Sequence, residues 1–155
     1  MPDRCRVAVE GPLPRELGVT RARLAAAARF FAAKSSARAG APFREVTVVL
    51  QDDAFSARVH LAVTGAPGAT DVVTQRYDPL PGEPGGVYGE LYVNARRALA
   101  AAPERRGWSP AKELLLYTAH GMDHLSGADD AAPDEYRRMR RRELAWLREW
   151  SSRTA

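Results

Sequence analysis

Apolar and polar residues follow patterns along the chain that predict four strands. Four stretches have a strand-like pattern, and they span residues 4–9, 45–50, 69–77 and 87–93. The first alternates apolar and polar positions, and the second is a run rich in β-branched residues. A loop rich in glycine and proline, residues 79–86, separates the last two. We therefore expect a sheet of about four strands.

Helical spacing covers most of the remaining chain. The predicted helices span residues 20–37, 94–102, 109–127 and 133–150. Thr20 and Ser109 are good N-caps, and Pro110 suits a first helical position because its missing N–H costs no hydrogen bond. Strands and helices are mixed at first and only helices follow, so the pattern predicts an α+β fold with helices packed on one sheet.

Length and composition narrow the class of protein. With 155 residues and 45% hydrophobic content, residues 1–155 are expected to form a single domain around one core. The best apolar stretch, residues 24–33, is short and contains Arg29, so we predict no membrane span. The amino terminus lacks the pattern of an export signal, and Cys5 is expected to be an ordinary apolar strand position. We expect a cytoplasmic protein.

The charge balance favours a polyanionic partner. The formal net charge is +4, and the 23 basic residues are arginines except for Lys34 and Lys112. Clustered cations gain by releasing counterions from phosphates, although an arginine bias can also reflect genome composition. Five arginines lie within residues 137–142 and cannot share one helical face, so this stretch is either a solvated surface or a contact for RNA.

The segment AHGMDHLSGADD, residues 119–130, carries the clearest candidate chemistry. His120 and His124 are four residues apart on a predicted helix, so both imidazoles can reach one zinc ion at roughly 2.0–2.1 Å. Gly127 can adopt the left-handed conformation that ends a helix and turns Asp130 back toward the histidines. Two imidazoles and one carboxylate leave a position for water, which is typical of a catalytic zinc site.

Several residues of this segment have a second interpretation. Asp129 is an alternative third ligand, and Asp123 is expected to be a solvated or capping side chain rather than a base. Zinc peptidases with this histidine spacing carry a glutamate base where this chain has Gly121, which disfavours proteolysis. Cleavage of RNA asks less of a protein base, because activated water or the 2′-hydroxyl of the RNA can attack.

The pattern H-x-x-x-H-x-x-G-x-x-D resembles the metal motif of the YbeY family of endoribonucleases and rRNA maturation factors. The resemblance extends over residues 52–147. Residues 68–72, GATDV, resemble the P-T-D-V-L-S-F segment of that family, and residues 89–91 resemble its G-D-I strand. The final helix repeats the spacing of the family at Glu135, Met139, Glu143 and Leu147.

This resemblance implies a zinc-dependent, single-strand-specific endoribonuclease that holds one zinc ion. It also implies a role in small-subunit rRNA maturation and ribosome quality control, with the small ribosomal subunit as partner, and a four-stranded mixed sheet surrounded by helices. The metal ligands that it implies are His120, His124 and Asp130, with aspartate in place of the third histidine of the family. An oxygen donor there can loosen the site or widen its choice of metal.

The sequence also departs from the pattern of the family. An arginine that precedes the T-D-V segment corresponds to Thr64 here, so a cation for phosphate binding is missing, and Arg76 is a candidate substitute. Thr70 and Asp71 either help to position substrate or pin a turn, and His60 is expected to be structural. Two alternatives therefore stay open: an RNA- or ribosome-binding factor with weakened catalysis, and a metallohydrolase with another substrate.

Overall fold

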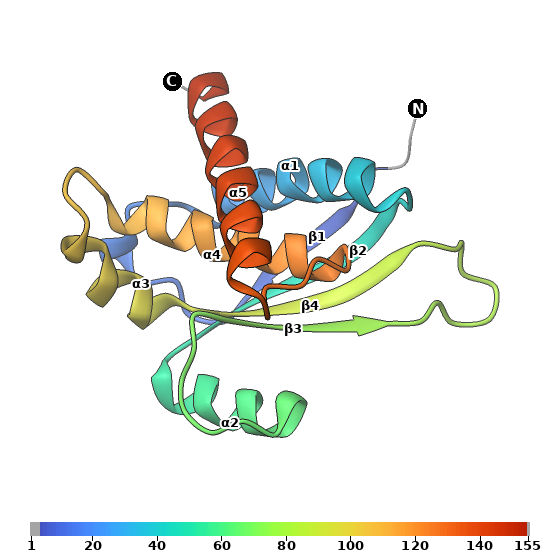
Figure 1. Ribbon diagram of the computed structural model, residues 1–155, viewed down its shortest axis with the longest axis horizontal. Helices are drawn as coiled ribbons and strands as arrows, with labels where there is room; N and C mark the ends of the chain where they lie inside the picture. Colours follow the sequence, from blue (N-terminus) through green and yellow to red (C-terminus); the bar gives the residue numbers. More distant parts are fainter. Residues whose placement is uncertain (1–3, 155) are drawn as a thin grey trace.

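The computed structural model describes residues 4–154, which form a four-stranded mixed sheet with helices on both sides (Figure 1). The strands are β1 (Arg6–Glu10), β2 (Phe43–Gln51), β3 (Val72–Tyr77) and β4 (Val87–Asn94). Their spatial order is β1-β2-β4-β3, with β1, β2 and β4 parallel and the edge strand β3 antiparallel to β4. The predicted α+β fold with a mixed sheet is confirmed.

Five α-helices surround this sheet. They are α1 (Arg21–Ala39), α2 (Asp53–Thr64), α3 (Ala95–Ala101), α4 (Pro110–Leu125) and α5 (Pro133–Arg153). The helices α1, α4 and α5 lie on one side of the sheet and α2 lies on the other (Figure 1). Among residues 4–154, no helix combines the length and the apolar character needed to cross a bilayer.

Side-chain caps fix where the main helices begin. Thr20 Oγ1 accepts a hydrogen bond from the Arg23 amide, and Ser109 Oγ accepts one from the Lys112 amide, each at 3.2 Å. Pro110 occupies the first turn of α4. Each cap pairs an amide that has no partner inside its own helix, which is why these two helix starts could be predicted from sequence.

The helix α2 was not predicted. Asp52 caps it by accepting from the Phe55 amide at 2.9 Å, and Gly65 ends it in the left-handed conformation with φ of 75°. Its only buried residue is Ser56, and Phe55 and Leu61 are exposed. A helix that buries so little apolar surface has almost no periodic signal in its sequence.

The strand β3 begins at Val72 rather than at the predicted residue 69. Ser56 Oγ donates to the Thr70 carbonyl at 3.1 Å and accepts from the Thr70 amide at 3.2 Å. Asp71 Oδ1 accepts from the Val72 amide at 2.8 Å. These hydrogen bonds fix the backbone at Thr70 and Asp71 before β3, and a part of either residue in positioning substrate stays a prediction.

The helix α4 runs through the centre of the core. All of its residues from Glu113 to Asp123 are buried, between the sheet on one side and helices α1 and α5 on the other. Cys5, just before β1, is buried at the edge of the same core, and burial raises the pKa of its thiol to about 11. At neutral pH the thiol is therefore protonated and unreactive, as expected for an apolar position.

The strands β3 and β4 approach α4 so closely at Gly89 that no side chain fits there. A β-carbon at Gly89 would lie 2.8 Å from Leu125 Cδ2 and 2.9 Å from the carbonyl oxygen of Gln75. We expect Gly89→Ala to lower the free energy of unfolding by about 1–3 kcal/mol, because the Gln75 backbone belongs to the paired strand and cannot yield cheaply.

Urea denaturation would measure the effect of Gly89→Ala, with Gly85→Ala as the matched control. A β-carbon at Gly85 would have no atom within 4 Å, so its replacement is expected to change stability by less than about 0.5 kcal/mol. Equal stabilities of the two variants would contradict the close approach at Gly89.

Candidate metal centre

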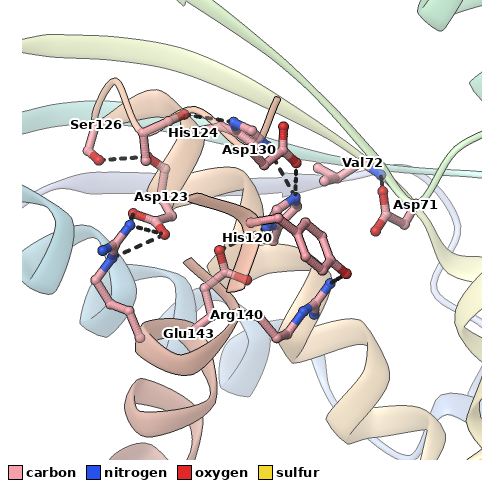
Figure 2. Close-up of polar contacts among 12 residues, drawn as sticks. Asp71, Val72, His120, Asp123, His124, Ser126, Asp130, Arg140 and Glu143 are labelled. Carbon is pink, nitrogen blue, oxygen red and sulfur yellow. Dashed lines mark hydrogen bonds and ion pairs between the residues drawn. The ribbon is translucent and has the colours of Figure 1, made fainter. Parts of the chain in front are cut away.

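Three side chains converge where α4 ends (Figure 2). His120 and His124 project from the last turns of α4, and Asp130 comes from the loop before α5. The two Nε2 atoms are 3.1 Å apart, and Asp130 Oδ2 lies 3.5 Å from His120 Nε2 and 3.3 Å from His124 Nε2. The structure thus brings together the three residues that the sequence spacing singled out.

A left-handed turn after α4 brings Asp130 to the histidines. Gly127 has φ of 98°, and its amide donates to the carbonyl of His124 at 2.9 Å. Asp129, the alternative third ligand, is exposed, and its Oδ1 accepts from the Ala131 amide at 3.0 Å. The carboxylate of Asp130, rather than that of Asp129, therefore faces the two imidazoles.

Hydrogen bonds determine which nitrogen of each imidazole is free. His120 Nδ1 lies 2.8 Å from Glu143 Oε2, and His124 Nδ1 lies 3.0 Å from the carbonyl oxygen of Ala128. A carbonyl or an ionised carboxylate can only accept, so both contacts place the ring proton on Nδ1. Both Nε2 atoms then carry lone pairs that point toward one another and toward the carboxylate of Asp130.

This set of donors fits a divalent metal ion. Donor atoms at 2.0–2.2 Å from a tetrahedral ion lie about 3.3–3.6 Å apart, close to the three observed separations of 3.1 to 3.5 Å. Two lone pairs and a carboxylate oxygen so close together repel one another unless a cation lies among them. The group of His120, His124 and Asp130 could therefore bind a metal ion, with one tetrahedral position left over.

Burial and nearby charges act in opposite directions on His120. Burial alone would lower the pKa of this imidazole, but the hydrogen bond and the charge of Glu143, with a contribution from Asp71, raise it above its usual value. Arg140 lowers the pKa of His120 by a smaller amount. The net effect is a more basic imidazole, which is a better electron donor to a metal.

Asp123 was expected to be solvated or to cap a helix, and this expectation is wrong. Its side chain is 0% exposed, and both of its oxygens accept hydrogen bonds from the Arg142 guanidinium at 2.8 to 3.2 Å. Arg38 Nε lies a further 3.9 Å from its Oδ1. Asp123 therefore joins α4 to both α5 and α1, through partners too distant in sequence to be recognised from the motif.

The basic stretch of α5 is only partly a solvated surface. Its three exposed arginines are Arg137, Arg138 and Arg141. Arg142 is half-buried on Asp123, and Arg140 is half-buried beside His120 in Figure 2. The guanidinium of Arg140 donates to Tyr136 Oη at 3.1 Å and lies over the ring of that tyrosine at 5.5 Å. Nothing in the run of arginines distinguishes Arg140 and Arg142 from their exposed neighbours.

The other candidate residues have structural contacts. Arg76 Nη1 donates to the carbonyl of Leu125 at 3.2 Å and so ties β3 to the end of α4. Thr64 Oγ1 donates to the carbonyl of His60 at 2.7 Å, and His60 Nδ1 contacts the carbonyl oxygen of Gly68 at 2.9 Å, as expected for a structural histidine. Thr64 and His60 belong to α2, across the sheet from α4 and α5 (Figure 1).

The backbone at Gly121 is packed closely against the sheet. A β-carbon there would lie 2.9 Å from Leu91 Cδ2 and 3.1 Å from Val72 Cγ2. The helix α4 thus rests directly on β3 and β4 at this point, and a larger side chain at Gly121 would require Leu91 and Val72 to shift. The glutamate base that zinc peptidases carry at this position therefore does not fit here without a shift of the neighbouring side chains.

Comparisons with known proteins match most of the chain to one family. The family model described as Endoribonuclease YbeY matches residues 17–151. A protein named Endoribonuclease YbeY from Thermobifida fusca is 38% identical over 104 residues, which cover 63% of this chain and 66% of that protein. One of the same name from Mycobacterium tuberculosis is 34% identical over 144 residues, which cover 86% and 78% respectively.

A solved structure has the same fold. The solution structure of TM1509 from Thermotoga maritima matches with a TM-score of 0.55 and 25% sequence identity, over 96% of this chain and 93% of that one. The matches to the curated relatives span between 60% and 82% of those proteins, so the first of them are matched over about two thirds of their length.

Proposed function

The chain belongs to the YbeY endoribonuclease family, and on this premise we propose that it is a metal-dependent endoribonuclease that cleaves single-stranded RNA. The observation that carries the proposal is the convergence of His120 Nε2, His124 Nε2 and Asp130 Oδ2 at separations that suit one ion. The family name supports a hydrolase that acts on RNA. Ribosomal RNA, the small ribosomal subunit and a cytoplasmic location are finer proposals, which rest on the sequence resemblance.

We propose zinc as the ion, because two imidazoles and one carboxylate form a ligand set that zinc enzymes use. When bound, zinc supplies a Lewis acid beside the phosphate that is attacked. The contribution of the chain is to hold the ligand atoms in place: the Ala128 carbonyl orients His124, and the turn at Gly127 positions Asp130.

Positive charge next to the cluster suits a polyanionic substrate. Arg140 is half-buried beside His120 and is held by stacking on Tyr136. An adjoining hollow of about 240 Å³ is lined by Arg38, Arg138 and Arg142, and also by the carboxylates of Asp129 and Glu135. Guanidinium groups bind phosphate oxygens with two hydrogen bonds at once. We propose that Arg140 contacts an RNA phosphate.

The test is cleavage of a labelled single-stranded RNA by the purified protein, with bound zinc measured in parallel. We expect cutting that stops with a chelator and returns with added zinc, with little cutting of single-stranded DNA. Asp130→Ala is expected to lower zinc content and cleavage at least about 10-fold, because it removes a ligand. The matched control, Asp129→Ala, removes a carboxylate outside the cluster and is expected to stay within about twofold.

The proposal would be rejected if RNA cutting continued in the presence of the chelator, or if Asp129→Ala and Asp130→Ala behaved alike.

One observation favours a second function, a ribosome- or RNA-binding factor without catalysis: Thr64 stands where the sequence pattern of the family has an arginine. Under this alternative the protein binds zinc and RNA but does not cut. A metallohydrolase with another substrate would bind zinc and neither bind nor cut RNA.

A further inference from the structure

A fully buried carboxylate, that of Glu143 on α5, contacts one of the candidate metal ligands. Glu143 is 0% exposed, and its Oε2 lies 2.8 Å from His120 Nδ1. Its second oxygen, Oε1, is buried and has no hydrogen-bond partner within residues 4–154. A buried carboxylate is costly to maintain unless its partners compensate for the lost hydration. The buried Glu113 also has an unpaired oxygen, Oε2, so what distinguishes Glu143 is its contact with a candidate metal ligand.

A comparison with Asp123 shows what a purely structural carboxylate looks like in this protein. Asp123 is equally buried, but both of its oxygens are paired with the guanidinium of Arg142. Glu143 directly follows Arg142 on α5. Its direct contact is with the imidazole of His120 instead of a cation. Arg140, one turn earlier on the helix, donates its hydrogen bond to Tyr136.

One face of α5 is directed toward the cluster. Tyr136, Arg140 and Glu143 are separated by four and three residues, which places them on the same side of the helix. In Figure 2, Glu143 and Arg140 both lie beside His120. The end of α4 supplies the two imidazoles, and this face of α5 forms a wall against the more buried of them, His120.

We propose that Glu143 is a positioning residue that holds the His120 ring in the orientation and tautomer in which Nε2 faces the metal. The proposal rests on the proposed function above, because it presupposes an ion at the cluster. The carboxylate accepts a hydrogen bond from the Nδ1–H group of His120, which leaves the lone pair on Nε2 directed toward His124 and Asp130. Carboxylates that contact a ligating histidine in this way strengthen it as a ligand, and their loss typically weakens metal binding 10–100-fold.

The two imidazoles are therefore oriented by different kinds of acceptor. His124 is held by the backbone carbonyl of Ala128, which no side-chain substitution removes, whereas His120 depends on the side chain of Glu143. Replacement of Glu143 should therefore affect one ligand of the set and leave the turn that orients the other in place.

The test is the zinc dissociation constant of the full-length protein, measured by competition with a chromophoric chelator. Glu143→Gln keeps the shape of the side chain but removes its charge, and we expect the dissociation constant to rise about 10–100-fold. Glu143→Met fills a similar volume without any acceptor and is expected to weaken zinc binding at least as much. Glu149→Gln, on the same helix, removes a surface carboxylate that pairs with Lys34 at 2.6 Å, and it is the matched control.

Melting temperatures of the metal-free proteins distinguish positioning from a purely structural role. A structural role alone would lower the melting temperature of Glu143→Gln and leave its zinc affinity equal to that of Glu149→Gln, and this result would overturn the inference. If the unmodified protein bound zinc tightly and Glu143→Gln bound it equally well, only the inference would fail. If the unmodified protein bound no zinc, the proposed function would fail with it.

Discussion

Replacement of His124 by alanine is expected to remove bound zinc and to lower RNA cleavage at least about 100-fold, beyond the loss typical of a residue that only supports a ligand. His124 supplies one of three ligand atoms, and two remaining donors cannot hold the ion in a fixed position. The side chain is 24% exposed, and its Nδ1 contacts one backbone carbonyl, so its removal leaves the core intact. Elemental analysis and the initial rate of RNA cutting would measure the two losses.

The matched control for this variant is His60→Ala. His60 lies on α2, on the other side of the sheet, and contacts the Gly68 carbonyl. Its replacement is expected to leave one zinc per chain. If His124→Ala kept one zinc per chain and cut RNA at the unmodified rate, the cluster would not be the metal centre, and any metal in the protein would be held elsewhere.

Replacement of Arg142 by alanine is expected to lower the free energy of unfolding by about 3 kcal/mol. The change leaves the Asp123 carboxylate buried without the guanidinium that pairs both of its oxygens, and such a loss typically costs 3–5 kcal/mol. Arg38 Nε, 3.9 Å from Asp123 Oδ1, still offsets part of the buried negative charge in this variant. We therefore expect a loss at the lower end of that range. Thermal denaturation of the metal-free protein should show a decrease of about 6–12 °C in the midpoint.

Arg141→Ala provides the comparison for Arg142→Ala, because Arg141 is the exposed neighbour on the same helix. We expect it to change stability by less than about 0.5 kcal/mol. The double variant Asp123→Ala with Arg142→Ala should recover part of the loss, since it removes the unpaired charge as well. Equal stabilities of Arg141→Ala and Arg142→Ala would show that the buried pair contributes little.

The parts of the fold that were predicted correctly have local signals. Thr20 and Ser109 precede helices and cap them, and the alternation of residues 4–9 and the β-branched run of 45–50 correspond to β1 and β2. The helix α2 was missed because it buries one serine and leaves its large apolar residues exposed, so its pattern resembles a loop. The start of β3 was misplaced because side-chain hydrogen bonds, which no periodicity reveals, pair the backbone before it.

The candidate site also has one part that local sequence predicts and one part that it does not. His120, His124, Gly127 and Asp130 lie within one helix end and the turn after it, so standard helix geometry was enough to predict that they converge. The side chains that pack around this cluster and the end of α4 come from the next helix, α5. They are Arg140, Arg142 and Glu143. These side chains are selected from a run of charged residues by how α5 packs on α4, and that packing depends on the whole core.

The location of the candidate ligands relative to the core has a consequence for how the protein would acquire its ion. All three ligand atoms lie at one end of α4, whereas the buried apolar side chains extend along α1, α4 and the sheet and do not include them. We therefore expect the chain to fold without a bound metal ion, in contrast to small domains whose folding depends on the ion. If the proposed function holds, activity would rise and fall reversibly with the free zinc concentration. A folded chain that had lost its ion could bind zinc again and regain activity without new protein synthesis.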